Sequence, residues 1–148
     1  MQGMKVSDEM TVTGQVTPDD LKQAAKDGFK SILNLRAPEE EGFLPDEKEK
    51  AQAAGLRYVN IPVKKEAIND ELTTKVLAEI DSLPKPALIH CASGMRAGAM
   101  ALMNVATRSG MNAKDAMDKA QSMGFDCSSE PELKAYFEQY VDSHQKVK

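Results

Sequence analysis

The stretch Ala87-Leu88-Ile89-His90-Cys91-Ala92-Ser93-Gly94-Met95-Arg96 decides the fold of this chain. It begins as a short apolar run, continues through small residues and a glycine, and leads into residues 97–107, which are apolar almost all round. A helix with that pattern is buried inside a fold. A buried strand, a tight turn and a buried helix in succession are typical of a parallel sheet covered by helices. We therefore expect residues 87–89 to form a strand that ends at His90-Cys91.

The rest of the chain repeats this alternation of strands and helices. Thr17 and Pro18 have the pattern of a helix cap followed by proline at the first helical position, and Gly28 and Gly55 are placed to end helices. The pattern predicts strands over 11–16, 29–35, 56–63 and 87–89, and helices over 17–28, 46–54, 70–83, 97–107, 112–124 and from the Ser129-Glu130-Pro131-Glu132 cap through Tyr140. We expect an α/β fold with three layers, in which helices flank a mostly parallel central sheet. Its binding site should lie at the carboxyl ends of the strands.

Length and composition limit the classes of protein to which the chain can belong. Its 148 residues are predicted to form a single domain over 1–148, with a core of about 9–142. The formal net charge of -4 argues against nucleic acid or an anionic membrane as a partner. The first residues hold charges and no apolar leader, so a cytoplasmic location is expected. With only two cysteines and no Cys/His cluster, we expect no metal and no cofactor. The oligomeric state stays open.

The residues after the last predicted strand have the composition of an anion-binding loop. Ala92, Ser93, Gly94 and Met95 can wrap a tight turn whose backbone N–H groups point inward, beside the positive end of the next helix. The same field favours thiolate over thiol at Cys91. Arg96 can place two N–H groups on the oxygens of a tetrahedral anion. Cys91 and Arg96 are therefore the predicted catalytic residues, acting as nucleophile and clamp.

These residues, together with several further landmarks, resemble a known family. The landmarks are Gly14-Gln15, Asn34-Leu35-Arg36, Gly55-Leu56-Arg57-Tyr58, Ile61-Pro62-Val63 and His90-Cys91 to Arg96. In this order they resemble cysteine-dependent phosphatases, and more closely the bacterial phosphatase-like domain of beta-lactamase-hydrolase-like proteins, over about residues 11–108. The resemblance implies a dual-specificity-phosphatase-like fold, with Cys91 and Arg96 at the family's nucleophile and anion-clamp positions.

Three features depart from the phosphatase pattern. Four residues separate Cys91 from Arg96, where phosphatases of this superfamily have five, and the shorter loop is similar to that of rhodaneses. Ala97 stands where these phosphatases usually have a hydroxyl that helps the thiolate leave. Lys64 and Lys65 precede the place expected for a general acid, so Glu66 and Asp70 are only candidates, and Asp70 is equally suited to begin a helix.

Other polar residues near the loop have an ordinary structural interpretation as well. His90 can simply fill space at the end of its strand. Arg36 can orient the loop or the substrate, or pair with the acids Glu39 to Glu41, which are themselves expected to be solvated. Cys127 can serve as a resolving thiol for oxidised Cys91, but a packing role is the simpler expectation.

Three hypotheses about function follow from these residues. The first is a phosphatase that acts on a phosphorylated small molecule or a phosphoprotein through a phosphocysteine intermediate. The second is a rhodanese-like sulfurtransferase, in which Cys91 takes sulfur from a sulfane-sulfur donor and carries it as a persulfide. The third is an anion-binding or redox module with little turnover. The loop length decides between the first two, and the physiological substrate is not readable from the sequence.

Overall fold

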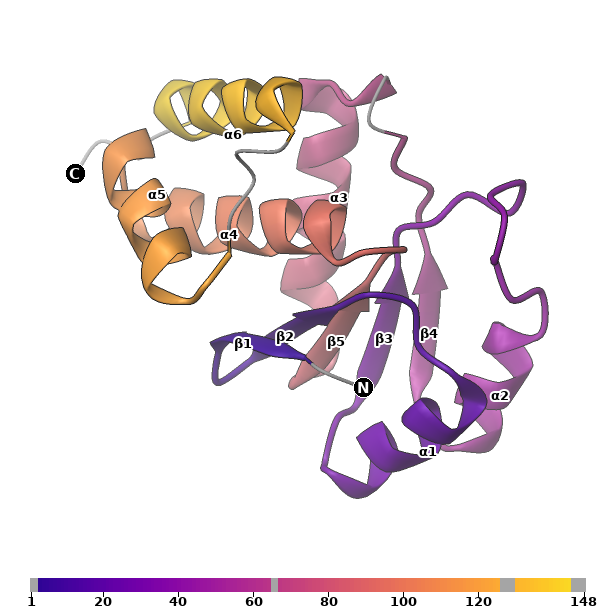
Figure 1. Cartoon of the computed structure of the whole chain (residues 1–148). Helices are drawn as coiled ribbons and strands as arrows, with labels where there is room; N and C mark the ends of the chain where they lie inside the picture. Colours follow the sequence, from indigo (N-terminus) through magenta and orange to yellow (C-terminus); the bar gives the residue numbers. More distant parts are fainter. Residues whose placement is uncertain (1–2, 65–66, 126–129, 145–148) are drawn as a thin grey trace.

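The fold is built on a five-stranded sheet, seen in a computed structural model that describes residues 3–64, 67–125 and 130–144. The strands are β1 (Met4–Ser7), β2 (Met10–Thr13), β3 (Ser31–Asn34), β4 (Arg57–Asn60) and β5 (Ala87–His90). They lie in the order β1-β2-β5-β3-β4 (Figure 1). Only β1 runs antiparallel to its neighbour, and the other pairs are parallel. The predicted mostly parallel sheet is confirmed.

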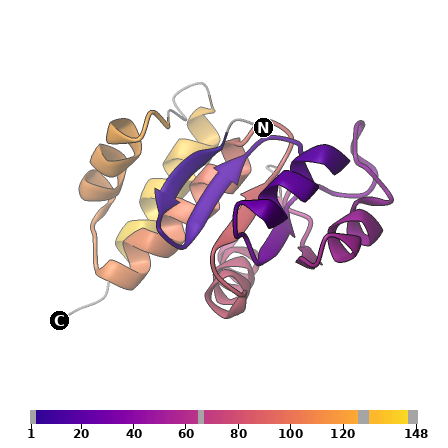
Figure 2. The same cartoon turned by 90° about the horizontal axis from the view of Figure 1, so that it is seen from below.

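Helices cover both faces of this sheet. They are α1 (Pro18–Lys26), α2 (Glu47–Ala53), α3 (Asp70–Ser82), α4 (Met95–Ser109), α5 (Ala113–Ser122) and α6 (Pro131–Ser143). The helices α1 and α2 lie on one face, and α3 to α6 lie on the other (Figures 1 and 2). Two clusters of buried side chains fill the two spaces: a small one with Leu21, Ile32 and Leu88 under α1 and α2, and a large one under the remaining helices. The three-layer α/β prediction is therefore confirmed.

Strand β5 lies at the centre of the sheet and delivers the chain to the predicted site. All four of its side chains are buried, and it pairs with β2 on one side and β3 on the other. At its last residue, His90 stands opposite Thr13 of β2 and Asn34 of β3. The carboxyl ends of three parallel strands therefore meet where the loop of Cys91 begins, which is the usual place for a binding site in such sheets.

The ends of the helices follow from local chemistry. Thr17 and Asp20 form a capping box at the start of α1, and Asn69 and Asn112 accept hydrogen bonds from the first turns of α3 and α5. Of these caps, the sequence predicted Thr17 and Asn112. Ser129, the predicted cap of the last helix, lies outside the described residues, and that helix begins at Pro131.

Several elements differ from the sequence prediction, and the strands predicted over 29–35 and 56–63 are shorter, as Ser31–Asn34 and Arg57–Asn60. Strand β1 was not expected, because Val6 is its only buried residue and a short edge strand carries little apolar alternation. The strand predicted over 11–16 is shorter and begins earlier, as Met10–Thr13, since Gly14 and Gln15 turn toward the loop of Cys91. Helix α4 starts at Met95, two residues before the predicted boundary, because Gly94 already completes the turn.

The described residues contain neither a candidate membrane-spanning helix nor a metal-binding cluster of side chains. None of their helices is both long and apolar enough to cross a membrane. Within the same residues, no group of three or more His, Cys, Asp or Glu side chains is arranged to hold a metal ion.

The packing of α4 against Phe125 gives a test of the fold. A Cβ atom on Gly98 would lie 2.2 Å from Cε1 of the Phe125 ring, so Gly98→Ala forces the ring to move. Overpacking should lower the free energy of unfolding by about 1–3 kcal/mol. The better helix propensity of alanine should offset about 1 kcal/mol of this loss. Urea denaturation measures this loss. In the double variant Gly98→Ala/Phe125→Leu the two losses should be less than additive. Strict additivity would contradict the contact.

Candidate active site

The loop that carries Cys91 is held against the carboxyl end of β2. The Cys91 N–H donates to the carbonyl oxygen of Thr13 at 3.3 Å, and Gln15 N–H donates to the carbonyl oxygen of Ala92 at 3.1 Å. A Cβ atom on Gly14 would lie 2.9 Å from that carbonyl oxygen, which is backbone and cannot rotate away. The Gly14-Gln15 landmark therefore serves to let β2 and the loop approach each other closely.

Cys91 is fully buried, and its sulfur accepts two backbone N–H groups. The Gly94 N–H lies 3.1 Å from Sγ and the Ala97 N–H lies 3.4 Å from it. Gly94 adopts the left-handed conformation with φ 94°, which lets the chain reverse between β5 and α4. The sulfur therefore lies at the amino end of α4, where the helix dipole and free N–H groups stabilise negative charge.

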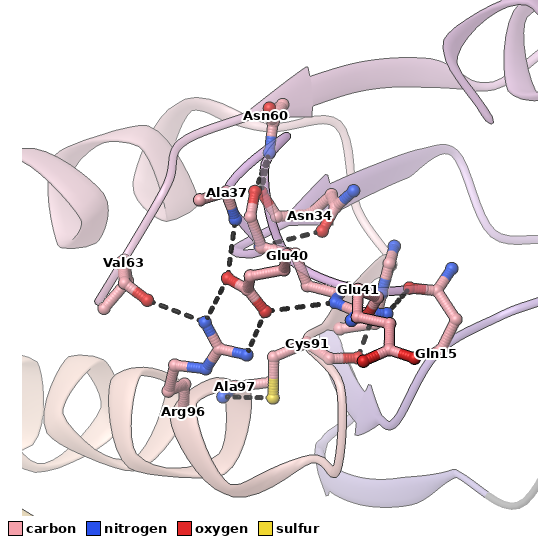
Figure 3. Close-up of polar contacts among 12 residues, drawn as sticks. Gln15, Asn34, Ala37, Glu40, Glu41, Asn60, Val63, Cys91, Arg96 and Ala97 are labelled. Atoms are coloured by element: carbon pink, nitrogen blue, oxygen red, sulfur yellow. Dashed lines mark hydrogen bonds and ion pairs between the residues drawn. The ribbon is translucent and has the colours of Figure 1, made fainter. Parts of the chain in front are cut away.

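Arg96 is oriented by two partners, Glu40 and Val63. Its Nη1 donates to Glu40 Oε2 and to the Val63 carbonyl oxygen, both at 2.8 Å, and its Nη2 donates to Glu40 Oε1 at 2.9 Å. Figure 3 shows the guanidinium with Val63 and Glu40 around it and Cys91 nearby. A guanidinium has five N–H groups, so Nε–H and the second Nη2–H, which share one edge, are not used by Glu40 or Val63. Hydrogen bonding to Glu40, with a smaller contribution from the neighbouring Cys91, raises the pKa of Arg96.

Glu40 corrects the expectation that the acids of its loop are merely solvated. Besides Arg96, its carboxylate accepts the Nε–H of Arg36 at 3.2 Å and the backbone N–H of Ala37 at 2.7 Å. Hydrogen bonds from Arg96 above all lower the pKa of Glu40 to about 2. Glu39, in contrast, makes an exposed ion pair with Lys64. The prediction fails at Glu40 because pairing across 56 residues leaves no local pattern in the sequence.

Arg36 is buried behind the loop rather than solvated. In addition to Glu40, its Nη1 donates to Gln15 Oε1 at 2.7 Å and its Nη2 donates to the Glu41 carbonyl oxygen. Its pairing with the acidic loop was one of two roles left open by the sequence, and the structure shows that pairing. Arg36 thereby fixes the loop that brings Glu40 to Arg96.

A buried histidine–glutamate pair lies beneath the loop, and sequence reasoning missed its acidic partner. His90 Nε2 lies 2.5 Å from Glu47 Oε2, and the second oxygen of Glu47 accepts from Gln15 Nε2 at 2.9 Å. Within its own helix, Glu47 resembles the exposed acid Glu49, and only the packing of α2 on the sheet distinguishes the two. His90 therefore has a buried carboxyl partner and is more than a space-filling residue.

The candidate general acids are not joined to the cysteine by a described contact. Asp70 is exposed in the first turn of α3, and its Oδ1 accepts from the Tyr136 hydroxyl at 2.9 Å. Among the residues that the structure describes, no hydrogen bond or ion pair links Asp70 to Cys91 or Arg96. Glu66 and Cys127 lie outside the described residues. Asp70 as an acid stays a prediction.

A hollow of about 290 Å³ adjoins the loop on its β2 side. Its lining includes Ser93, Gly94 and Met95 of the loop, together with Met4 and Phe125. Neither Cys91 nor Arg96 lines this space.

The fold and this site define a class: the chain has the α/β architecture of the dual-specificity and tyrosine-phosphatase-like proteins. Its residues 4–108 match the model of the beta-lactamase hydrolase-like protein, phosphatase-like domain, and the chain belongs to that family.

Individual relatives agree with this assignment. The chain is 29% identical over 152 residues to the beta-lactamase hydrolase-like protein of Agrobacterium fabrum, covering 93% of this chain but 35% of that relative. The chain thus spans about a third of the relative's length. Among solved structures, it is similar to a DUF442 phosphatase-like protein of Shewanella putrefaciens CN-32, with a TM-score of 0.83, 21% identity and coverage of 97% and 93% of the two chains. It is also similar to P. aeruginosa TpbA in complex with pTyr, with a TM-score of 0.73, 17% identity and coverage of 88% and 79%.

The charge on Glu40 should make stability depend on pH. Because its pKa falls from 4.5 to about 2 on folding, Glu40 contributes stability that is complete above pH about 5 and is lost as pH falls toward 2. We expect Glu40→Gln to cost about 1.5–3 kcal/mol at neutral pH, since it leaves two arginines without their carboxylate. The difference from the parent protein, followed by thermal unfolding, should shrink steadily below pH about 4.5.

Glu39→Gln is the matched control for this experiment. Its carboxylate is exposed and pairs only with Lys64 in a surface contact, so little change is expected. A Glu40→Gln protein as stable as Glu39→Gln at neutral pH would contradict the role assigned to Glu40.

Proposed function

We propose that this protein is a cysteine-dependent phosphatase-like hydrolase that acts on phosphomonoesters. One observation carries the proposal: the Cys91 sulfur receives two N–H groups at the amino end of α4, next to an arginine whose remaining donor edge is not used by Glu40 or Val63. Membership of a phosphatase-like family supports it. In its bidentate contact with Glu40, this guanidinium donates to two anionic oxygens side by side, as it would to a phosphoryl group.

The proposed reaction uses Cys91 as the nucleophile. The thiolate attacks phosphorus, an S–P bond forms, and the P–O bond to the leaving group breaks. The leaving oxygen takes a proton from a general acid or, for an aryl leaving group, departs as the anion. Water then attacks phosphorus and releases phosphate together with the regenerated thiolate. Arg96 stabilises the charge on the phosphoryl oxygens through the Nε–H and Nη2–H edge that Glu40 and Val63 do not use, while Glu40 and the Val63 carbonyl hold the guanidinium in place.

The substrate class is a phosphorylated small molecule or a phosphoprotein. TpbA, which has this fold, is found in complex with pTyr. The site of the present chain is backed by Arg36 and Arg96, which favour an anionic group despite the net charge of -4. An aryl phosphate is therefore a suitable first probe.

Phosphate release from an aryl phosphate tests this proposal. Cys91→Ser should abolish turnover, and Arg96→Ala should lower kcat by about 10²–10³, the usual cost of removing one group that stabilises transition-state charge. Cys127→Ser, the other cysteine, serves as the matched control and should keep the parent rate. Equal phosphate release by the parent protein and Cys91→Ser would overturn the proposal.

A second candidate function, sulfur transfer, is favoured by the shape of the loop. Only four residues separate Cys91 from Arg96, and the Gly94 and Ala97 N–H groups are directed at the sulfur itself. At position 97 only the backbone contributes, since alanine has no hydroxyl to assist a leaving thiolate. In this reaction the Cys91 thiolate attacks the sulfane sulfur of thiosulfate, a Cys–S–S bond forms and sulfite leaves. Cyanide then takes the outer sulfur as thiocyanate and returns the thiolate.

Thiosulfate and cyanide, assayed beside the aryl phosphate, separate the two reactions. For sulfur transfer we expect thiocyanate to form, and Cys91 to gain the mass of one sulfur atom when cyanide is withheld. Thiocyanate without phosphate release would replace the first proposal with the second. If inorganic phosphate binds but neither product forms, and Arg96→Ala abolishes that binding, the site is an anion-binding module.

A further inference from the structure

The hollow of about 290 Å³ beside the anion loop is used by neither proposed reaction. Ser93, Gly94 and Met95 of the loop belong to its lining, whereas Cys91 and Arg96 do not. We propose that this hollow is a second binding site, for a small uncharged molecule with an apolar ring or branched chain, and that its occupancy is coupled to anion binding at the loop. The inference goes beyond the proposed function, because neither phosphate nor sulfur transfer requires such a ligand.

The lining of the hollow defines the chemical class of the ligand. Its apolar side chains are Met4, Val12, Met95 and Phe125, and among the described residues that line it none is charged. A charged ligand would lose hydration there without gaining an ion pair, whereas an apolar ligand would gain free energy by leaving water. Ser93 adds a hydroxyl to which one polar group of the ligand can hydrogen-bond. The ligand is therefore uncharged and mostly apolar.

The volume of the hollow limits the ligand to one ring or a short branched chain. An engineered apolar cavity of about 150 Å³ already holds benzene. A space of about 290 Å³ accordingly accommodates one substituted ring. A fragment of this size should bind weakly, with a dissociation constant of about 1 mM.

The walls of the hollow are held in place by the fold itself. The Phe125 ring lies directly on the backbone of α4, because a Cβ atom on Gly98 would be only 2.2 Å from it. The Phe125 N–H donates to the Ala120 carbonyl oxygen at 2.9 Å, which ties residue 125 to the end of α5. Met4 and Val12 stand opposite each other in the β1–β2 register. The hollow is thus largely formed before a ligand arrives, as binding sites usually are.

The position of Arg96 indicates that the ligand is a molecule separate from the substrate. Glu40 and Val63, which orient its guanidinium, follow β3 and β4. The hollow is bounded instead by β1, β2 and residue 125. In the sheet, β1 and β2 lie on one side of β5, and β3 and β4 lie on the other (Figure 1). A phosphate bound to the guanidinium is therefore held toward the side of β5 that is opposite to the hollow.

Gly94 connects the hollow to the sulfur. It belongs to the lining, and its N–H donates to Cys91 Sγ at 3.1 Å. A Cβ atom on Gly94 would lie 3.5 Å from the Thr13 backbone, so the turn rests against the end of β2. A ligand in the hollow packs against this turn, and an anion in the loop bonds to N–H groups of the same turn. Both ligands favour one arrangement of the turn, and so each should strengthen the binding of the other.

Titration with 4-fluorobenzyl alcohol, an uncharged aromatic probe, tests the site by ¹⁹F NMR. Met4→Ala should weaken binding of the probe about three- to tenfold, because it removes apolar contact from the hollow. Met117→Ala is the matched control, since Met117 is a half-buried methionine that packs on the same core and does not line the hollow. Equal affinities in a folded Met4→Ala protein and in Met117→Ala would overturn the proposal.

A measurement on the unaltered protein covers the case in which Met4→Ala does not fold. In protein labelled with ¹³C at the methionine methyl groups, the probe should shift the signals of Met4 and Met95 and leave that of Met117 in place. Unshifted Met4 and Met95 signals at saturating probe would overturn the proposal.

The coupling is measured on Cys91→Ser, in which no turnover is expected. Saturating inorganic phosphate should lower the dissociation constant of the probe about fivefold, and the probe should strengthen phosphate binding by the same factor. Phenyl phosphate should act as inorganic phosphate does. If phenyl phosphate displaces the probe and inorganic phosphate does not, the hollow holds the ring of the substrate, and the proposal of a separate site is overturned. Phosphate without any effect on the probe would also overturn it.

These measurements distinguish the failure of this inference from the failure of the proposed function. A protein that binds the probe and phosphate together but releases no product from either substrate would overturn only the proposed function. A protein that hydrolyses an aryl phosphate but does not bind the probe would overturn only this inference.

Discussion

The reversal of the chain between β5 and α4 is the constraint on which the rest of the site depends. Two backbone N–H groups can reach the Cys91 sulfur only because Gly94 takes a left-handed conformation between the strand and the helix. A side chain at this position would be strained in that conformation, and its Cβ would also lie 3.5 Å from the Thr13 backbone. The turn therefore fixes the nucleophile, the start of the helix and the approach of β2 at once.

Around this turn, the arginines are paired with an individual carboxylate and do not form a broad positive patch. The chain is acidic overall, yet the site contains Arg36 and Arg96, both held by Glu40, and His90, which lies against Glu47. Glu40 sets the orientation of Arg96, and Glu47 lies against His90. Buried charges of this kind contribute little net stability, but they fix geometry. We interpret these carboxylates as the groups that hold the side chains of the proposed anion site in a fixed orientation.

The family assignment and the details of the loop bear on different questions. The fold, the order of landmarks and the match over residues 4–108 establish a phosphatase-like domain. The four-residue spacing and the alanine at position 97 concern the size of the group at the sulfur and the ease with which the thiolate leaves. A fold shared by many proteins supports more than one chemistry, and so the reaction is decided by the loop rather than by the sheet.

The sequence by itself determined the α/β alternation, the mostly parallel sheet, the position of Cys91 after the last strand and the turn at Gly94, whereas the central place of that strand is known only from the structure. The features that the sequence determined follow from apolar periodicity, helix caps and glycine placement, all of which act between near neighbours in the chain. Only the tertiary structure decided that Glu40 binds Arg96 and that Glu47, alone among the acids of its helix, is buried against His90. The physical reason is that these pairs join residues 56 and 43 positions apart, and the burial that makes them significant exists only after the layers have packed.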